Sequence, residues 1–383
     1  MANALSVLVV GGGIGGLTAA LALSRAGCRV SVYEQAREFR PVGAGLQLSS
    51  NALSVLERID LPMGRQNAID IEKTEVCDGI TGRLITRIAT PENRHTLVLS
   101  RAALQARLLE AVAADAAIEL HTGAQMVDIL DGKKLVSLTL ADGTMRSGDA
   151  LIGADGVWSQ TRRFVNAARP DYSGRIAWRT VMPLSAVPAD ISRHTVTLWL
   201  APGAHLVTYP IDKGAAFNAV AITQGDWQAE GWSQPGAMTD LALAFAQWHS
   251  PVQQLVQSTG NWLKWALCTI DPGMSWTKGR IALLGDAAHA MVPFMAQGAG
   301  MSIEDGWVLA QQLGRATPPD VGAALQKYQT GRQDRVTRVW DTSMQQGKIY
   351  HLDGALRLCR NAVMQSGGRF LKSRYNWIYD WQG

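Results

Sequence analysis

The chain carries the stretch Leu5-Ser6-Val7-Leu8-Val9-Val10-Gly11-Gly12-Gly13-Ile14-Gly15-Gly16 near its start. A continuous apolar run of this length is typical of a buried parallel strand, and the glycines after it predict a tight turn. An alanine-rich helix is predicted for residues 17–26, and a second strand for Arg29–Glu34. Strand, glycine turn, helix and strand together indicate a Rossmann-type unit, so we expect an α/β fold.

The glycine spacing in this unit predicts a dinucleotide site. Gly11 permits the tight turn, Gly13 lets the backbone approach a pyrophosphate, and Gly16 lets the helix pack closely on the strand. The positive end of the helix attracts phosphate, and Glu34 at the end of the second strand is placed to bind ribose hydroxyls. The predicted cofactor residues of this unit are Gly11, Gly13, Gly15, Gly16, Glu34 and Gln35.

Two further fingerprints follow short apolar strands much later in the chain. They are Gly153-Ala154-Asp155-Gly156 and Gly285-Asp286-Ala287-Ala288-His289. Each alone is compatible with a turn between two elements. The three fingerprints in this order resemble the single-component FAD-dependent aromatic hydroxylases, the family of p-hydroxybenzoate, salicylate and 3-hydroxybenzoate hydroxylases. The resemblance covers most of the chain, and it favours FAD over NAD as the bound dinucleotide.

The resemblance also implies roles for individual residues. Asp286 would hold the flavin ribityl chain, and Asp155 belongs to a motif associated with both FAD and NAD(P)H. The segment Pro293–Met301 would lie beside the flavin ring, with a helix starting near Ser302 that points its positive end at the ring. The segment Arg40–Gln47 resembles a loop alongside the flavin. The implied cofactor residues are Gly45, Arg101, Val127, Asp155, Asp286, Gly298, Gly300 and Met301, and the implied substrate residues are Gln47 and Pro293.

A histidine and a tyrosine are the candidates for acid–base chemistry. His205 and Tyr209 lie on a predicted strand, where their even spacing puts both side chains on one face. They resemble the His…Tyr-Pro pair of 3-hydroxybenzoate-type hydroxylases. With Gln297 they would surround a phenolic hydroxyl, with His205 as the base and Tyr209 and Gln297 as positioning groups. Gln47 stands where several relatives have a histidine, and an amide cannot act as that base.

The resemblance implies an FAD-dependent monooxygenase of aromatic compound catabolism that consumes NADH or NADPH and O2. It would hydroxylate a phenolic or N-heteroaromatic ring, expected to bear a carboxylate, through a flavin hydroperoxide. Decarboxylative hydroxylation of a salicylate-like acid is the alternative, and a non-hydroxylating flavin oxidoreductase is a weaker one. A plain NAD-dependent dehydrogenase and a non-catalytic binding module do not account for the later motifs. The exact substrate and the choice of NADH or NADPH stay open.

The expected architecture is a Rossmann-like FAD-binding domain of the p-hydroxybenzoate hydroxylase type with an inserted mixed β-sheet substrate domain and C-terminal helices. Proline breaks and Trp, Thr and Val enrichment mark the insertion. We assign residues 1–67, 100–172 and 273–330 to the FAD-binding domain, 68–99 and 173–272 to the substrate domain, and 331–383 to the C-terminal helices.

Composition narrows the class of protein further. The net charge is +4 with no basic run, which excludes a nucleic-acid footprint and weakly favours anionic small substrates. Four scattered cysteines form no CxxC pair, so we expect no metal site and no disulfide framework. No apolar run is long enough to span a bilayer, and we expect a cytoplasmic protein. The aromatic tail (Tyr375, Trp377, Tyr379, Trp381) is compatible with a homodimer interface.

Overall fold

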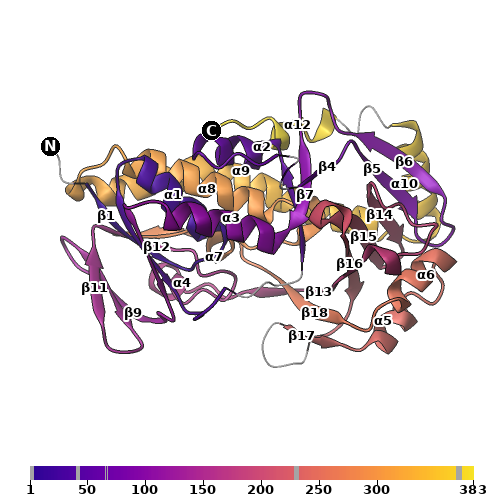
Figure 1. Ribbon diagram of the computed structural model, residues 1–383, viewed down its shortest axis with the longest axis horizontal. Helices are drawn as coiled ribbons and strands as arrows, with labels where there is room; N and C mark the ends of the chain where they lie inside the picture. The colour runs from indigo at the N-terminus through magenta and orange to yellow at the C-terminus, as the bar shows by residue number, and fades with distance from the viewer. Residues whose placement is uncertain (1–3, 40–43, 65, 67, 228–232, 368–372) are drawn as a thin grey trace.

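Two large β-sheets, set side by side and connected by long helices, make up the molecule (Figure 1). The computed structural model describes residues 4–39, 44–64, 66, 68–227, 233–367 and 373–383. Among these residues, no helix combines the length and the apolar character that crossing a bilayer requires.

The first sheet has six strands and contains the N-terminal βαβ unit. Its order is β19-β20-β12-β1-β2-β8, and every neighbouring pair is parallel except β19 with β20. The strands are β19 (Thr277–Lys278), β20 (Ile281–Leu283), β12 (Ala150–Gly153), β1 (Ser6–Val10), β2 (Arg29–Glu34) and β8 (Ile118–Thr122). The continuous apolar run of β1 is buried, as a sheet covered on both faces requires.

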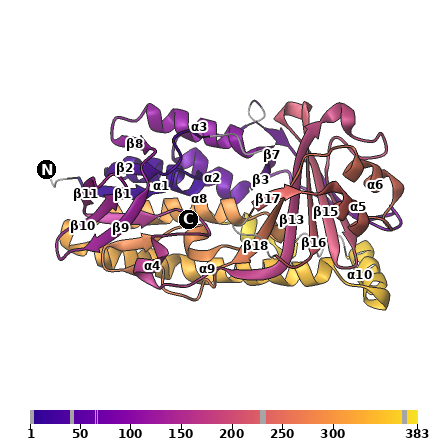
Figure 2. The same cartoon turned by 90° about the horizontal axis from the view of Figure 1, so that it is seen from below.

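Helices cover one face of this sheet, and a small antiparallel sheet covers the other (Figures 1 and 2). The helices are α1 (Ile14–Arg25), α3 (Arg101–Ala113) and α8 (Gly298–Leu313). The small sheet consists of β9 (Met126–Asp131), β10 (Val136–Leu140) and β11 (Met145–Gly148), whose apolar side packs against β1 and β12.

The second sheet has eight strands in the order β17-β18-β13-β16-β15-β14-β5-β6, and only β14 with β5 is parallel. The strands are β17 (Ser233–Gly236), β18 (Trp262–Thr269), β13 (Asp171–Pro183), β16 (Ala216–Gln224), β15 (Ala204–Ile211), β14 (Val196–Ala201), β5 (Lys73–Asp78) and β6 (Leu84–Ala89). One face packs on α5 (Met238–Ala244) and α6 (Ser250–Gln257) in a tryptophan-rich core. The other face packs in places on β7 (Thr96–Ser100) and on the ends of α9 (Val321–Tyr350) and α10 (Gly354–Ser366), and it lines a cavity between them.

The remaining elements connect these two sheets. A three-stranded sheet joins β3 (Gly45–Ser49), β7 (Thr96–Ser100) and β4 (Ile69–Asp70), and α2 (Ser50–Arg58) follows β3. Short helices α4 (Arg162–Val165) and α7 (Asp286–His289) follow β12 and β20. The 30-residue helix α9 (Val321–Tyr350), about 45 Å long, runs from the first sheet to the second, where α10 (Gly354–Ser366) contacts β6 (Figure 2). The short helix α12 (Asn376–Tyr379) returns to α2.

The expected α/β fold, with a mixed-sheet second unit and C-terminal helices, is confirmed, but details differ. Of residues 68–99, β5 and β6 join the eight-stranded sheet, whereas β4 and β7 pair with β3. Helix α8 begins at Gly298, one turn before the predicted start near Ser302. Glycines are poor helix formers, but this turn is held by the bond from the Met301 amide to the Gln297 carbonyl.

A buried network of charged groups ties α8 to α9. Arg332 donates from Nη1 to Glu304 Oε2 at 2.6 Å and from Nε to Asp305 Oδ1 at 2.7 Å, and all three side chains are fully buried. Asp305 Oδ2 also lies 2.6 Å from His289 Nε2, and Arg335 donates twice to Glu304. Burial alone would raise the pKa of Asp305, but His289 and Arg332 outweigh it and hold this pKa below its ordinary value.

We expect Arg332→Ala to destabilise the protein by about 3–5 kcal/mol, because it leaves two buried carboxylates with fewer cationic partners. Arg87→Ala is the matched control: Arg87 pairs with Glu75 at 2.9 Å but is 59% exposed, so its loss is expected to cost less than about 1 kcal/mol. Thermal unfolding of both variants measures the difference. Equal shifts of the unfolding midpoint would show that the network contributes no more than a surface pair.

Candidate active site

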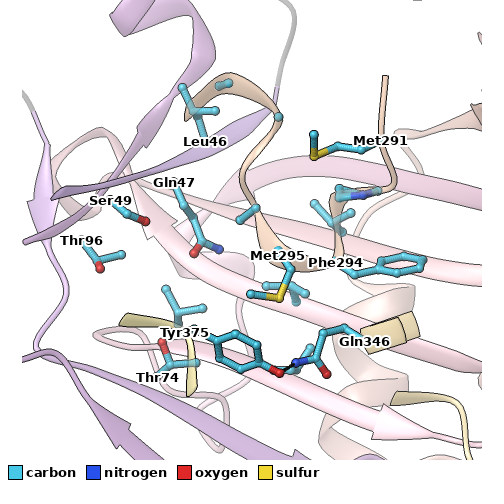
Figure 3. A pocket seen from close by; sticks show the side chains of 18 of the residues that line it. Leu46, Gln47, Ser49, Thr74, Thr96, Met291, Phe294, Met295, Gln346 and Tyr375 are labelled. Atoms are coloured by element: carbon cyan, nitrogen blue, oxygen red, sulfur yellow. Dashed lines mark hydrogen bonds between the residues drawn. The ribbon is translucent and has the colours of Figure 1, made fainter. Parts of the chain in front are cut away.

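A cavity of about 830 Å³ lies between the first sheet's loops and the face of the second sheet that α5 and α6 do not cover. Figure 3 shows that its walls come from segments far apart in the chain: Gln47 from β3, Met295 from the loop before α8, and Gln346 from α9. Gln346 is hydrogen bonded to Tyr375, which precedes α12, and the two close one side of the cavity. The volume falls in the range of ligand sites.

The three fingerprints meet at one edge of the first sheet. They follow the carboxyl ends of β1, β12 and β20, which are neighbouring parallel strands. Ligands of open α/β sheets bind at this edge. A Cβ on Gly11, where φ is +109°, would lie 2.4 Å from the Ala154 carbonyl oxygen, and one on Gly15 would lie 2.8 Å from Leu284. The first fingerprint therefore packs directly against the segments of the other two.

Some glycines of the fingerprints are required by packing within the protein, whereas others leave space for a ligand. A Cβ on Gly16 would lie 2.0 Å from the Gly11 carbonyl oxygen, so Gly16 is required by helix packing. In contrast, a Cβ on Gly13 or Gly298 would meet no protein atom within 4 Å, although both residues line the cavity. Backbone open to empty space at these two points is what a close-lying pyrophosphate and flavin ring would need.

Two charged side chains stand beside this cradle. Arg101 is exposed at the first turn of α3, and Asp286 is exposed at the first turn of α7, and both line the cavity. The 16-residue helix α8 starts at Gly298 with its positive end at the same wall. The residues present therefore fit FAD, with Gly13 for the pyrophosphate, Asp286 for the ribityl hydroxyls and α8 for the electron-rich end of the ring.

Several predicted cofactor residues do not line the cavity. Glu34 accepts from the Gly12 amide at 2.7 Å and the Ala36 amide at 2.8 Å, so it also holds the glycine loop. Asp155 accepts from Ser159, Gln160 and Thr161 and organises the turn into α4. The side chains of Gln35 and Val127 are exposed elsewhere. Residues 40–43 of the predicted flavin loop lie outside the described residues.

Only some of the predicted site residues in and around the start of α8 line the cavity. Pro293 and Gly298 line it, whereas Gly300 and Met301 are buried behind the wall. The Gln297 side chain is 3% exposed and does not reach the cavity, contrary to its predicted contact with a substrate hydroxyl. Its Oε1 accepts from Asn51 Nδ2 at 3.0 Å, and its Nε2 lies 3.4 Å from Ser49 Oγ. Contacts with Ser49 on β3 and Asn51 on α2 therefore hold the Gln297 side-chain amide away from the cavity.

The second sheet supplies the floor of the cavity. Because side chains alternate along a strand, residues in register on one face form rows across the sheet. One row runs Arg179–Val220–Val207–Leu198–Val76–Thr86, and a second contains Ile222 and His205. A third row contains Val196, Thr74 and Ile88, and Tyr209 packs in one cluster with Val196. All of these residues line the cavity.

His205 and Tyr209 lie on one face of β15, as predicted, and both line the cavity. His205 Nδ1 lies 2.7 Å from Nε2 of His351, the residue after α9, and its ring packs edge-on against Phe294 and Tyr350. Burial, followed by His351 and Arg175, lowers the pKa of His205 well below 6.5. Burial also lowers the pKa of His351 to about 3. The pair is therefore neutral near pH 7, and His205 Nε2 remains available as a hydrogen-bond acceptor.

Tyr209 packs against the start of β3. A Cβ on Gly45 would lie 2.7 Å from the Tyr209 hydroxyl oxygen, so Gly45 is needed for this close approach. Burial raises the pKa of Tyr209 above its ordinary value, although Arg179 acts in the opposite direction. The phenol therefore stays protonated near pH 7, where it can donate a hydrogen bond but cannot serve as a base. Gln47 and Gly45 both line the cavity beside it.

Sequence reasoning missed Arg179, His351 and Phe294 as individual site residues. Arg179 could have been found, because a charged residue stands on the same face of its strand as Ala177 and Val181. His351 gave no local signal, since only the path of α9 brings it to His205. Among the described residues, no three His, Cys, Asp or Glu side chains are grouped so that they could hold a metal ion.

We expect Gly13→Ala to leave the fold intact but weaken FAD binding by about 10- to 100-fold. The backbone there (φ −74°, ψ 179°) suits alanine, and the added methyl group meets no protein atom, so only a bound cofactor would be displaced. Gly260→Ala, at an exposed position with the same free space, is the control. Fluorescence titration of the apoproteins with FAD measures both. Unchanged affinity of Gly13→Ala for FAD would contradict the placement of the pyrophosphate beside Gly13.

Comparisons with known proteins agree with this geometry. The FAD binding domain family model matches residues 4–343. A 3-hydroxybenzoate 6-hydroxylase from Aquipseudomonas alcaligenes is 34% identical over 97% of this chain and 96% of its own length. A 6-hydroxynicotinate 3-monooxygenase from Bordetella bronchiseptica is 30% identical over 87% of this chain and 89% of its own length.

A solved structure agrees as well. A salicylate hydroxylase substrate complex superposes with a TM-score of 0.85 at 27% identity, covering 99% of this chain and 96% of that one. Agreement in sequence and in fold extends over nearly the whole molecule. The chain therefore belongs to the single-component FAD-dependent aromatic hydroxylases, which are flavoprotein monooxygenases.

Proposed function

We propose that this protein hydroxylates the ring of a phenolic or N-heteroaromatic carboxylic acid, with FAD bound and with NAD(P)H and O2 as co-substrates. The observation that carries the proposal is the cavity floor, which sets His205 and Tyr209 on one face of a cavity that the residues of the FAD cradle also line. Relatives that share the fold are named for 3-hydroxybenzoate and 6-hydroxynicotinate, which are both hydroxylated ring acids.

The chain's own residues contribute binding, orientation and proton transfer. FAD, when bound, supplies hydride acceptance from NAD(P)H and the activation of O2. Apolar side chains of the floor, such as Val207 and Val220, would exclude water from the ring. His205 Nε2 would accept the proton of the ring hydroxyl, which raises the electron density of the ring, while the Tyr209 hydroxyl donates to the same oxygen. This role requires the tautomer of His205 in which Nδ1 carries the hydrogen and donates it to His351, so that Nε2 is free to accept a proton.

Decarboxylative hydroxylation is the second reaction that this cavity could support. One structural relative is a salicylate hydroxylase, so a 2-hydroxy acid is a reasonable substrate for this cavity. Replacement of a carboxylate by a hydroxyl would release carbon dioxide, whereas simple hydroxylation would retain the carboxyl group.

The expected homodimer and cytoplasmic location remain proposals. Trp377 and Trp381 of the tail stack on arginines of α9 in the same chain, so these rings have intramolecular partners.

We expect at least one hydroxybenzoate or hydroxynicotinate to accelerate NAD(P)H oxidation by the FAD-loaded protein and to gain one oxygen atom. The measurement is a panel of such acids followed by absorbance at 340 nm, with product masses recorded. A product lighter by a carboxyl group and heavier by a hydroxyl would assign decarboxylative hydroxylation instead. FAD binding without a response to any acid in the panel would contradict the proposed substrate class.

We expect His205→Asn to lower hydroxylation by about 100-fold or more while leaving FAD content unchanged. Because burial lowers the pKa of His205, it is neutral throughout the range from about pH 6 to pH 8. The wild-type rate should therefore not fall with an apparent pKa near 6.5 as the pH is lowered, and acid loss through His205 should begin only below that value. His194→Asn, at an exposed histidine, is the control. Turnover that survives in His205→Asn would remove the base assignment.

A further inference from the structure

The floor of the cavity is longer than one aromatic acid needs. Its central row runs from Arg179 on β13 through Val207 on β15 to Thr86 on β6, and every residue of the row lines the cavity. The spacing of neighbouring strands gives this row a length of about 24 Å. A single ring that bears a carboxylate and a hydroxyl is much shorter, so part of the floor lies beyond the ring.

The cofactor end of the row is at Arg179. Burial lowers the pKa of this guanidinium to about 10, and Tyr209, Arg101 and Asp286 lie close enough to act on the same pKa. Arg101 and Asp286 belong to the FAD cradle, and Tyr209 belongs to the proposed ring site. The opposite end of the row, about 14 Å past Val207, therefore lies on the side of the ring site that faces away from the cofactor.

Apolar side chains line this opposite end of the floor. Val76, Leu198 and Ile88 come from the sheet, and Met364 of α10 packs in one cluster with them. Helix α10 contacts β6 here. This part of the cavity, which we call the distal lobe, therefore lies between α10 and the strands β14, β5 and β6.

The face that α10 turns to the cavity is apolar but incompletely packed. Leu356, Cys359, Val363 and Met364 recur at helical spacing, and all four line the cavity. Even so, the exposed fraction is 61% for Leu356 and 63% for Val363. An apolar stripe of a helix is ordinarily buried against the element that it faces. The stripe on α10 therefore has apolar surface left to bury against a ligand.

The charged residue of the distal lobe already has partners in the protein. Arg360 lines the cavity, but its Nε and Nη2 donate to Asn361 Oδ1 at 3.0 and 2.8 Å. Its Nη1 donates to the Tyr350 carbonyl oxygen at 2.6 Å. Because these nitrogens have acceptors, the lobe does not need an anion from outside the chain, and its apolar walls favour an apolar group.

We infer that the distal lobe binds an apolar substituent of the aromatic substrate, such as a short alkyl chain, while the ring lies over Val207 beside His205 and Tyr209. The inference rests on the proposed function and deepens it, because it adds an apolar extension to the class of ring acid that binds best. The extension would point along the floor, away from the flavin. Each methylene group that the lobe buries should tighten binding by about three- to fourfold.

The test compares benzoate with 3-butylbenzoate and 4-butylbenzoate, which lack the ring hydroxyl and need not react. Each acid is titrated into the FAD-loaded protein, and binding is followed by the change in flavin absorbance. In the wild type we expect at least one butyl isomer to bind about 10- to 100-fold more tightly than benzoate, because its chain reaches the distal lobe.

Two variants place a charge in the lobe at exposed positions of α10. Val363→Asp and Cys359→Asp should each reduce the gain from the butyl chain to less than about threefold, while benzoate affinity stays within about twofold. Leu358→Asp is the matched control, because Leu358 is 65% exposed on the same helix but does not line the cavity. This control should keep the full gain.

No gain for either butyl isomer in the wild type would overturn the inference, and so would a gain that survives in both Val363→Asp and Cys359→Asp. An equal loss in Leu358→Asp would show that any charge on α10 has this effect, and would also reject it. If Val363→Asp changes the oligomeric state in sedimentation but leaves the gain intact, the stripe packs on a second copy of the chain and the inference is wrong. Since these acids need not react, failure of every acid in the turnover panel would count against the proposed function alone.

Discussion

Two buried carboxylates on one helix, Glu304 and Asp305 of α8, hold together the segments that surround the cofactor cradle. Asp305 accepts from the Gly285 amide at 3.1 Å and from His289, which fixes the loop that presents Asp286. Glu304 accepts from Asn51 at 2.7 Å, and the same asparagine orients Gln297 at the start of α8. Arg332 balances both charges from α9. Buried charges tolerate little displacement of their partners, so the loops around the cradle are fixed relative to one another.

Helix α9 extends this constraint to the substrate side of the cavity. About 29 Å beyond Arg332 along the helix axis, its last turn brings His351 to His205, and the His351 carbonyl oxygen accepts from the Gly203 amide at the tip of the β14–β15 hairpin. Ser343 donates to the Val292 carbonyl oxygen on the way, which anchors the loop carrying Pro293. One element therefore positions the loops of the cofactor cradle, the loop that carries Pro293 and the base candidate. This explains how a site assembled from distant segments can keep a defined geometry.

Local patterns were enough to predict the parts of the site that depend on backbone shape. The turn at Gly11–Gly16 and the strand that carries His205 and Tyr209 follow from patterns within a few residues, whereas the interest in Asp286 came from the resemblance to the hydroxylase family. The directions of individual side chains were harder to predict than the backbone turns and strands. Gln297 turns away from the cavity because Asn51, 246 residues earlier, supplies its partner. Asp155 is taken up by its own turn, which a motif cannot distinguish from ligand binding. Arg179 could be assigned to the cavity floor only from the strand register, which places it in one row with Val220 and Val207.

We propose that the cavity brings FAD, O2 and an aromatic acid together so that one oxygen atom of O2 enters the ring. The most direct measurement is turnover under ¹⁸O2, with the organic product examined by mass spectrometry. We expect one labelled oxygen atom in the product and no new oxygen atom derived from solvent water. Consumption of NAD(P)H that yields only hydrogen peroxide, or a product whose new oxygen comes from water, would contradict it.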